Sequence, residues 1–203
     1  MKPILFNGDM VRAILDGRKT QTRRVMKPQP NPITNGPVDH LKIYTSGWME
    51  GESAPKYVLE KCPYGQPGDL LYVKEAFAKN ISGCPNGITY RADHVNPRGD
   101  GPVNPIKWTS ARFMPRSASR ITLRIIDVRV QRVQEIGESD AMSEGVVSKF
   151  DGQKYFPIGY VFKELWDSIN AKRGFGWDVD PWVWCISFEH VKQSQSGGGN
   201  DGR

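Results

Sequence analysis

The 203-residue sequence has little cysteine and histidine and lacks long apolar runs. No stretch of about 18 apolar residues occurs and no signal-peptide core opens the chain, so we expect neither a membrane span nor secretion. Its three cysteines cannot all pair with one another, and their wide spacing matches no zinc pattern. A reduced, cytoplasmic setting is therefore the expectation.

Metal-binding signatures are missing as well. The three histidines, His40, His94 and His190, stand apart from one another in polar sequence, which predicts surface positions. No HxH, CxxC or paired-carboxylate spacing occurs. We therefore expect no metal ion and no organic cofactor.

Glycine, proline and scattered arginine are what the chain does contain. The 21 Gly and 15 Pro are typical of a compact core wrapped in irregular segments, and the length fits one large domain. The net charge of +6 comes from arginines spread along the chain more than from lysine blocks. This pattern favours selective anion pockets and a polyanionic partner over a nonspecific basic tail.

Strands outnumber helices among the predicted elements. The apolar pattern predicts strands over residues 3–6, 22–26, 70–77, 88–92, 120–133 and 181–191, and helices over residues 8–16, 136–146 and 160–170. In the longest strand the alternation changes phase between Ile125 and Ile126, which indicates a bulge or a sharp bend. We therefore expect a mixed α+β, mainly β fold, in which a curved β-barrel carries a few capping helices.

Two segments with poor periodicity are predicted to be long loop insertions, residues 28–66 and 78–105. Tyr44, Trp48 or Tyr57 would dock the first of them against the rest of the protein. Residues 192–203 have no apolar side chain and are predicted to be disordered. Residues 1–191 then form a single domain.

One basic stretch, residues 17–24, indicates a site. A helix is predicted to end at Gly17, and cationic and hydroxyl side chains follow. Lys19 and Thr22 lie three residues apart, so a single turn could direct both at one point, and Arg24 alternates with Thr22 along a strand. Such a cluster suits an anion, a phosphate or a polar base, and the alternative is a solvated basic turn.

The same stretch resembles the Gly-x-Lys-Thr-x-Thr-x-Arg signature of the ASCH domain, a relative of the PUA RNA-binding barrel. Further segments resemble the family's Gly-Asp-x-Leu-x-Val strand, its helix after the long central strand, and its closing strand: residues 67–73, 136–145 and 182–189. With residues 114–116 and 118–120, the pattern is similar to ASCH proteins of bacteriophages and prophages. The resemblance covers about residues 1–191 and implies a PUA-like barrel in which both loop insertions are elaborations.

Within this family, the motifs are similar to those of the small bacterial 4-acetylcytidine amidohydrolases. These enzymes use a lysine, a threonine three residues later and a distant glutamate, which fall on Lys19, Thr22 and Glu144. The resemblance thus implies hydrolysis of an acylated pyrimidine nucleoside such as 4-acetylcytidine, with Thr22 as the nucleophile. Lys19 is either a neutral base or a protonated stabiliser, in which case Glu144 takes the proton.

Other functions stay open at this point. The chain could be a non-catalytic module that binds RNA or a modified nucleotide, and a ribonuclease is a third option. In the alternative in which these residues form no site, Thr22 is an ordinary strand hydroxyl and Lys19 forms a surface ion pair with Glu144. Convergence of the three residues in a pocket the size of one base favours catalysis, whereas an open basic groove favours binding.

Six more residues are candidates for substrate binding. Arg18, Thr20 and Arg24 belong to the basic turn, Glu75 follows a predicted strand, and Arg116 and Arg120 precede the longest strand. Each could equally be a solvated surface group. Four tryptophans could stack on a base or pack in the core: Trp48, Trp108, Trp182 and Trp184.

Overall fold

A five-stranded sheet lies at the centre of the computed structural model, which describes residues 1–30, 56–94 and 106–191. Its strand order is β1-β3-β6-β9-β2. The bounds are Lys2–Leu5 for β1, Leu70–Lys74 for β3, Thr122–Arg132 for β6, Trp182–His190 for β9 and Gln21–Val25 for β2. The β1–β3 pair is parallel and the other three pairs are antiparallel.

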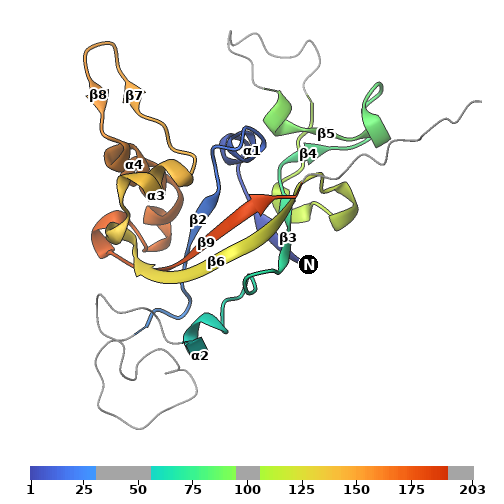
Figure 1. The fold of residues 1–203 in the computed structure, drawn as a ribbon. Helices are drawn as coiled ribbons and strands as arrows, with labels where there is room; N and C mark the ends of the chain where they lie inside the picture. Colours follow the sequence, from blue (N-terminus) through green and yellow to red (C-terminus); the bar gives the residue numbers. More distant parts are fainter. Residues whose placement is uncertain (31–55, 95–105, 192–203) are drawn as a thin grey trace, which may run out of the picture.

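The long antiparallel pair of β6 and β9 curves through the whole molecule (Figure 1). Its register shifts between Ile125 and Asp127, which is the bend that the sequence predicts. Before the shift Leu123 and Ile125 are buried, and after it Val128 and Val130 are buried, while Ile126 is exposed. The bulge therefore keeps apolar side chains on the core face and leaves Asp127 off it.

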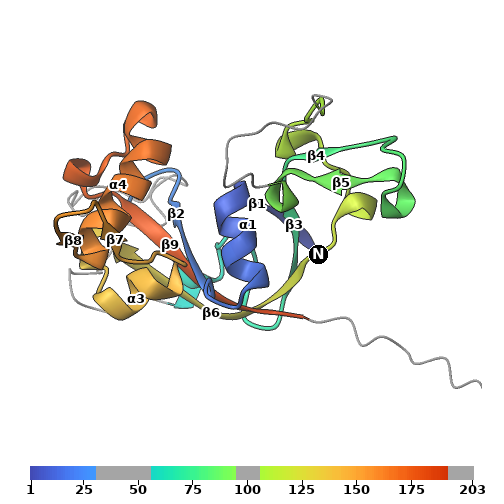
Figure 2. The same cartoon turned by 90° about the horizontal axis from the view of Figure 1, so that it is seen from above.

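Helix α1 (Gly8–Leu15) packs over the middle of the sheet (Figure 2). The Asn7 side chain caps it by accepting a hydrogen bond from the Met10 amide at 2.9 Å. Its buried stripe includes Val11 and Ile14, which join the main core with residues of β1, β3, β6 and β9. Gly17 follows in the left-handed region at φ 75°, so the chain turns sharply into β2.

Two smaller groups of elements flank α1 in Figure 2. One contains α3 (Glu138–Ser143), the hairpin of β7 (Lys149–Phe150) and β8 (Tyr155–Phe156), and α4 (Ile158–Asn170). It has its own core, in which Phe162 and Trp166 of α4 pack with Cys185 of β9. The other contains the hairpin of β4 (Phe77–Ala78) and β5 (Thr89–Tyr90).

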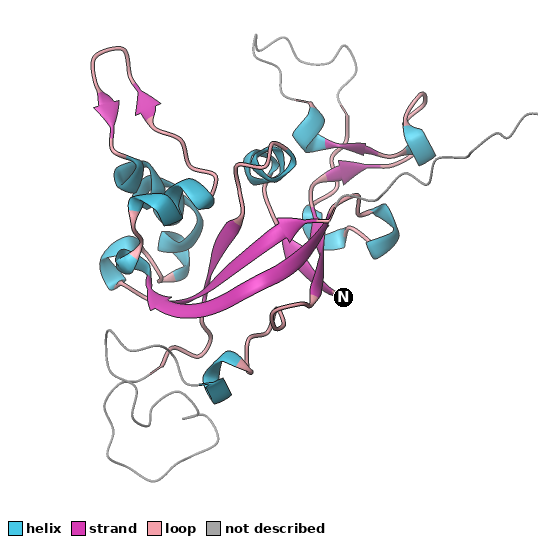
Figure 3. Ribbon diagram, viewed as in Figure 1, coloured by secondary structure: helices cyan, strands magenta, loops and turns pink. Residues whose placement is uncertain are grey.

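Short helical turns connect these elements (Figure 3). Helix α2 (Lys56–Leu59) precedes β3. The 3-10 turns are Pro85–Gly87, Arg91–Asp93, Ala111–Phe113, Arg116–Ala118, Val133–Glu135, Ala171–Arg173 and Trp177–Val179. Within the described ranges, no helix is long and apolar enough to cross a membrane.

The predicted mixed fold, with a large sheet and few helices, is confirmed. The closed barrel is not seen: the strand pairs of the described residues leave β1 and β2 at opposite edges of an open, curved sheet. The hairpin β7–β8 was not predicted, although Asp151-Gly152 is a common turn dipeptide.

The predicted loop insertions contain some regular structure. Residues 78–94 hold β5 and two helical turns, while 95–105 lie outside the described residues. In the first insertion Tyr44 and Trp48 also lie outside them, and Tyr57 is 40% exposed. Val58 and Cys62 are instead the buried residues that dock this segment in the main core. The predicted tail, 192–203, is not described either.

Candidate functional site

Strand β2 carries the predicted threonine at an edge of the sheet, paired only with β9 among the described strands. Thr22 is opposite Ile186 in the register and is 2% exposed. Side chains alternate along a strand, so Gln21 and Arg23 share one side of β2 while Thr22 and Arg24 share the other. The edge position leaves β2 free to form the wall of a cleft.

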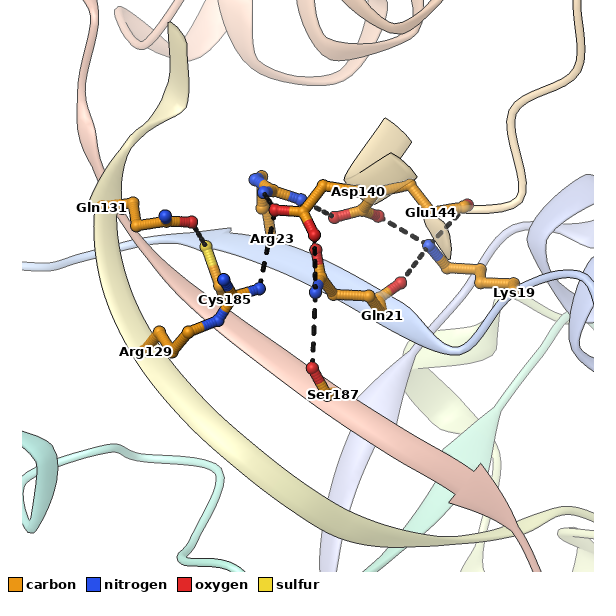
Figure 4. Close-up of polar contacts among 9 residues, drawn as sticks. All are labelled: Lys19, Gln21, Arg23, Arg129, Gln131, Asp140, Glu144, Cys185 and Ser187. Atoms are coloured by element: carbon orange, nitrogen blue, oxygen red, sulfur yellow. Dashed lines mark hydrogen bonds and ion pairs between the residues drawn. The ribbon is translucent and has the colours of Figure 1, made fainter. Parts of the chain in front are cut away.

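Lys19 and Glu144 meet immediately before β2 (Figure 4). The Lys19 ammonium lies 2.7 Å from Glu144 Oε2, 2.8 Å from the Glu144 carbonyl oxygen and 2.8 Å from the Gln21 carbonyl oxygen. Its three donors thus each have an acceptor. The side chains are 0% and 4% exposed, so this ion pair is buried and does not lie on the surface.

Burial is the largest influence on the pKa of Lys19 in this pair. Desolvation lowers the pKa of Lys19 below its ordinary value, although the attraction and the hydrogen bond of Glu144 act in the opposite direction. Arg23 and Arg24 lower it further by repulsion. Burial therefore favours the neutral amine and the contacts with Glu144 favour the ammonium, and the net result is a lowered pKa of Lys19.

Arg23 connects the pair to helix α3 (Figure 4). Its guanidinium donates to Glu144 Oε1 at 3.3 Å and to Asp140 Oδ2 at 2.6 Å. Its Nη1 also donates to Gln21 Oε1 at 2.6 Å. Burial opposes ionisation of Asp140, but the Arg23 hydrogen bond and charge outweigh it and lower the pKa of that carboxyl. Glu144 is thus held between two cations, one on each carboxylate oxygen.

The end of helix α3 brings Glu144 to this position. Glu144 is its C-terminal cap and Gly145 follows at φ 83°, in the left-handed region. A Cβ at Gly145 would lie 2.9 Å from Ala13 Cβ and 3.0 Å from Lys19 Cβ, so α3 and α1 approach each other closely here. The Thr20 amide also donates to the Ser143 carbonyl oxygen at 2.8 Å.

A cleft of about 390 Å³, which we call the first cleft, opens beside β2 and is lined by both Thr22 and Glu144. Lys19 has no exposed side-chain surface and reaches this cleft through Glu144. The other lining residues are cationic, aromatic or aliphatic for the most part: Met10, Arg23, Arg24, Val25, Lys27, Pro63, Tyr64, Phe162, Leu165, Trp166, Ile169, Asn170, Arg173 and Trp184. This mixture suits a planar ligand with polar or anionic groups.

The remaining residues of the basic turn lie at different places. Arg24 lines the first cleft, donates to the Leu5 carbonyl oxygen at 2.6 Å and lies 5.0 Å from the Phe6 ring centre. Arg18 and Thr20 are exposed, and Arg18 is paired with Asp16 at 2.8 Å. Neither lines the first cleft.

Glu75 and Arg120 come together, but in a separate cluster near β4 and β5. The Arg120 guanidinium binds both carboxylate oxygens of Glu75, at 2.8 and 3.1 Å, and both of Asp93, at 2.8 Å. It also lies 4.0 Å from the Tyr90 ring centre. Burial raises the pKa of Glu75 despite its pairing with Arg120. Arg116 is exposed, and none of these residues lines the first cleft.

Several residues of this site were not predicted. Arg23 is not among the predicted site residues, and Asp140 lies 117 positions from it, so no local pattern joins them. Of the tryptophans, Trp184 lines the first cleft, Trp182 is buried in the main core and Trp48 lies outside the described residues. In the part of the chain that the structure describes, no group of histidine, cysteine and carboxylate side chains could hold a metal ion.

Comparisons with known proteins find only a weak structural likeness. No family model and no curated protein matches the chain. Among solved structures, it is similar to the crystal structure of protein EF3133 from Enterococcus faecalis V583, of the family DUF984, at 13% identity and a TM-score of 0.41. The alignment covers 94% of this chain and 81% of that one. A likeness of this size carries no information about whether the two proteins share an activity.

Proposed function

We propose that this chain is an ASCH domain of PUA-like type that hydrolyses the amide of an acylated pyrimidine nucleoside such as 4-acetylcytidine. The observation that carries the proposal is that Thr22 and Glu144 line one cleft of about 390 Å³, with the Lys19 ammonium 2.7 Å from Glu144. These three residues are the ones that the motifs select. They come together only through the fold, because Glu144 lies 125 residues after Lys19.

The contacts favour a protonated Lys19. Three acceptors surround its ammonium, so removing its proton would leave one acceptor without a donor. In the proposed reaction, the Thr22 hydroxyl oxygen attacks the acyl carbon and Glu144 takes the hydroxyl proton. Glu144 then gives this proton to the leaving amino group as the amide bond breaks. Water releases the acyl group from the resulting ester of Thr22.

The cations next to these groups have two tasks in this scheme. Lys19 and Arg23 bind one oxygen each of the Glu144 carboxylate and keep it oriented. Arg24 lines the cleft and is a donor available to the negative charge that develops on the acyl oxygen. No metal ion or organic cofactor has a role in the scheme.

The first cleft also matches a nucleoside in size and chemistry. Its volume lies in the range typical of small-ligand sites, at about 300–1,000 Å³. Tyr64, Phe162, Trp166 and Trp184 offer aromatic surface to a base, and Asn170 offers a donor and an acceptor. A pyrimidine with an acylated amine needs both kinds of contact.

Incubation of the pure protein with 4-acetylcytidine tests this function, with release of cytidine followed by chromatography. Thr22→Ala should remove nearly all turnover, and Thr22→Ser should retain a part because it keeps the hydroxyl oxygen. Thr20→Ala is the matched control, because Thr20 is an exposed hydroxyl two residues away that does not line the cleft. Turnover that survives Thr22→Ala unchanged would show that Thr22 is not the nucleophile.

Two further variants test the proton scheme. Glu144→Gln should lower kcat by at least about 100-fold, the size expected for loss of a general base. Lys19→Arg keeps the charge but should also fail, because a planar guanidinium cannot place donors where the ammonium meets its three acceptors. Full activity of Lys19→Arg would mean that only the charge of Lys19 is needed.

A non-catalytic binding module is the second candidate, and the complete pairing of Lys19 favours it. A lysine with three acceptors and no exposed surface is also what a purely structural ion pair requires. Such a module would bind 4-acetylcytidine in the first cleft without releasing cytidine. Calorimetric binding of 4-acetylcytidine with no cytidine formed would select this function.

A further inference from the structure

A larger cleft, which we call the second cleft, adjoins the first. Its volume is about 960 Å³, and it shares Met10, Arg24 and Ile169 with the first cleft. Its other lining residues come from the start of α1 and from the part of the chain around β4 and β5: Leu5, Phe6, Asn7, Gly8, Asp9, Arg12, Ala76, Arg91, His94, Trp108, Thr109, Ser110 and Ala111. A ligand in the first cleft could thus continue past Arg24 into the second.

Positive charge is available along this path. Arg91 is exposed and, among the described residues, has no ion pair. Arg24 at the junction uses one nitrogen on the Leu5 carbonyl oxygen, and its Nε has no hydrogen-bond partner within the described chain. The carboxylate of Asp9 is paired with Arg12, which also donates to a backbone carbonyl oxygen. The second cleft therefore has free cations, and its one lining carboxylate is already paired.

The second cleft also contains an aromatic side chain suited to stacking. Trp108 lines it and is half-buried, so a part of its surface is open. His94 lies beside it, with the ring centres 5.2 Å apart, and accepts or donates a hydrogen bond with the Thr89 hydroxyl at 2.7 Å. A cationic groove with an aromatic platform is the usual way to hold a single-stranded polynucleotide.

We propose that the substrate of the first cleft is an acylated cytidine within a single-stranded polynucleotide, whose next nucleotide occupies the second cleft. Arg91 binds backbone phosphate, Arg24 stays with the acyl oxygen in the first cleft, and Trp108 stacks on the next base. This inference rests on the proposed function and names its substrate class. Single strands are required because a base inside a duplex cannot reach an enclosed cleft. A free nucleoside would leave the cations of the second cleft without an anion.

The test compares 4-acetylcytidine with a five-nucleotide RNA that carries one 4-acetylcytidine at its centre. The kcat/KM for the RNA should be at least about 10-fold higher at low salt, and this advantage should shrink as salt rises. Arg91→Gln and Trp108→Ala should each lower the ratio of RNA to nucleoside kcat/KM by about 5-fold or more. Arg124→Gln is the matched control, because Arg124 is an exposed arginine outside both clefts, paired with Glu189. Equal kcat/KM for both substrates would overturn the inference.

A binding measurement separates failure of the inference from failure of the proposed function. Fluorescence anisotropy would follow a labelled RNA of the same sequence on Thr22→Ala protein. If the wild type hydrolyses neither substrate, yet the RNA binds with a salt-dependent affinity that Arg91→Gln reduces, the reaction is wrong and the second cleft still holds a polynucleotide. If the nucleoside is hydrolysed, yet Arg91→Gln changes neither RNA binding nor the ratio of RNA to nucleoside kcat/KM, the proposal that the substrate is a polynucleotide is refuted. Binding of duplex RNA as tight as that of the single strand would also refute it.

Discussion

Replacing Glu144 by glutamine should destabilise the fold by about 3–5 kcal/mol at neutral pH, the usual effect of removing one partner from a buried ion pair. The side chain is 4% exposed and neutralises the Lys19 ammonium at 2.7 Å and the Arg23 guanidinium at 3.3 Å. Glutamine keeps the shape and loses the charge, so Lys19 would have no carboxylate partner and Arg23 would keep only Asp140. For a domain of this size, the melting temperature should fall by roughly 6–20 °C.

The same variant should regain stability as the pH rises. Burial lowers the pKa of Lys19 and Glu144 raises it, so Glu144→Gln lowers this pKa further. Between that lowered pKa and the ordinary value of the unfolded chain, the unfolded state binds more protons. The free energy of unfolding of the variant therefore rises with pH, by up to about 1.4 kcal/mol per pH unit. The wild type has the same slope above its own lowered Lys19 pKa, so the difference from wild type should shrink only as the pH passes from the Lys19 pKa of the variant to that of the wild type.

Urea unfolding followed by tryptophan fluorescence at pH 6 and pH 9 measures both effects. Glu189→Gln is the control, because it removes the same charge from an ion pair with Arg124 whose side chains are about half exposed. That pair should contribute at most about 1 kcal/mol, with little change between the two pH values. A double variant, Lys19→Met with Glu144→Gln, should lose the pH dependence. If Glu144→Gln costs no more than Glu189→Gln at both pH values, the buried charges are not balanced as described.

Three further predictions concern the surroundings of the site. Gly145→Ala should cost at least about 1 kcal/mol, because its φ is 83° and a Cβ would meet Ala13 and Lys19, whereas Gly137→Ala meets no atom within 4 Å; urea unfolding compares the two. Glu75 has a raised pKa, so its folded form binds a proton more readily and its contribution to stability falls as pH rises. The unfolding free energy of Glu75→Gln minus that of wild type should hence increase from pH 4.5 to pH 7. Cys185 is buried with its pKa raised to about 12, so iodoacetamide at pH 8 should label it at least about 100-fold more slowly than the half-buried Cys84, as read by mass spectrometry; equal rates would contradict this.

Local patterns were sufficient for the backbone around the site. The predicted helix over residues 8–16 is α1, and its cap at Asn7 and its buried residues depend on neighbouring positions alone. The change of phase at Ile125 predicted the bulge for the same reason, because alternation is read along one strand. Gly17 likewise has the positive φ that the end of a helix needs.

Burial of charged groups could not be predicted in this way. Lys19 stands in a basic stretch, where a solvated turn is the ordinary interpretation, yet its side chain is 0% exposed. Its burial depends on Glu144 and on the contact between Gly145 and helix α1, more than 120 positions away. Closure of a sheet into a barrel is also a long-range property, and among the described strand pairs β1 and β2 are not paired with each other.

The position of β2 at the sheet edge has a consequence for the synthesis of the protein. Among the described strands β2 pairs only with β9, and residues 182–190 follow Thr22 by about 160 positions. While the chain emerges from the ribosome, the segment with Thr22 has no strand to join until β9 has been made. Lys19 likewise has no carboxylate partner until Glu144 has been synthesised. A nascent chain that stops before β9 therefore exposes the basic segment without its cleft, and any activity of the site begins only once β9 is in place.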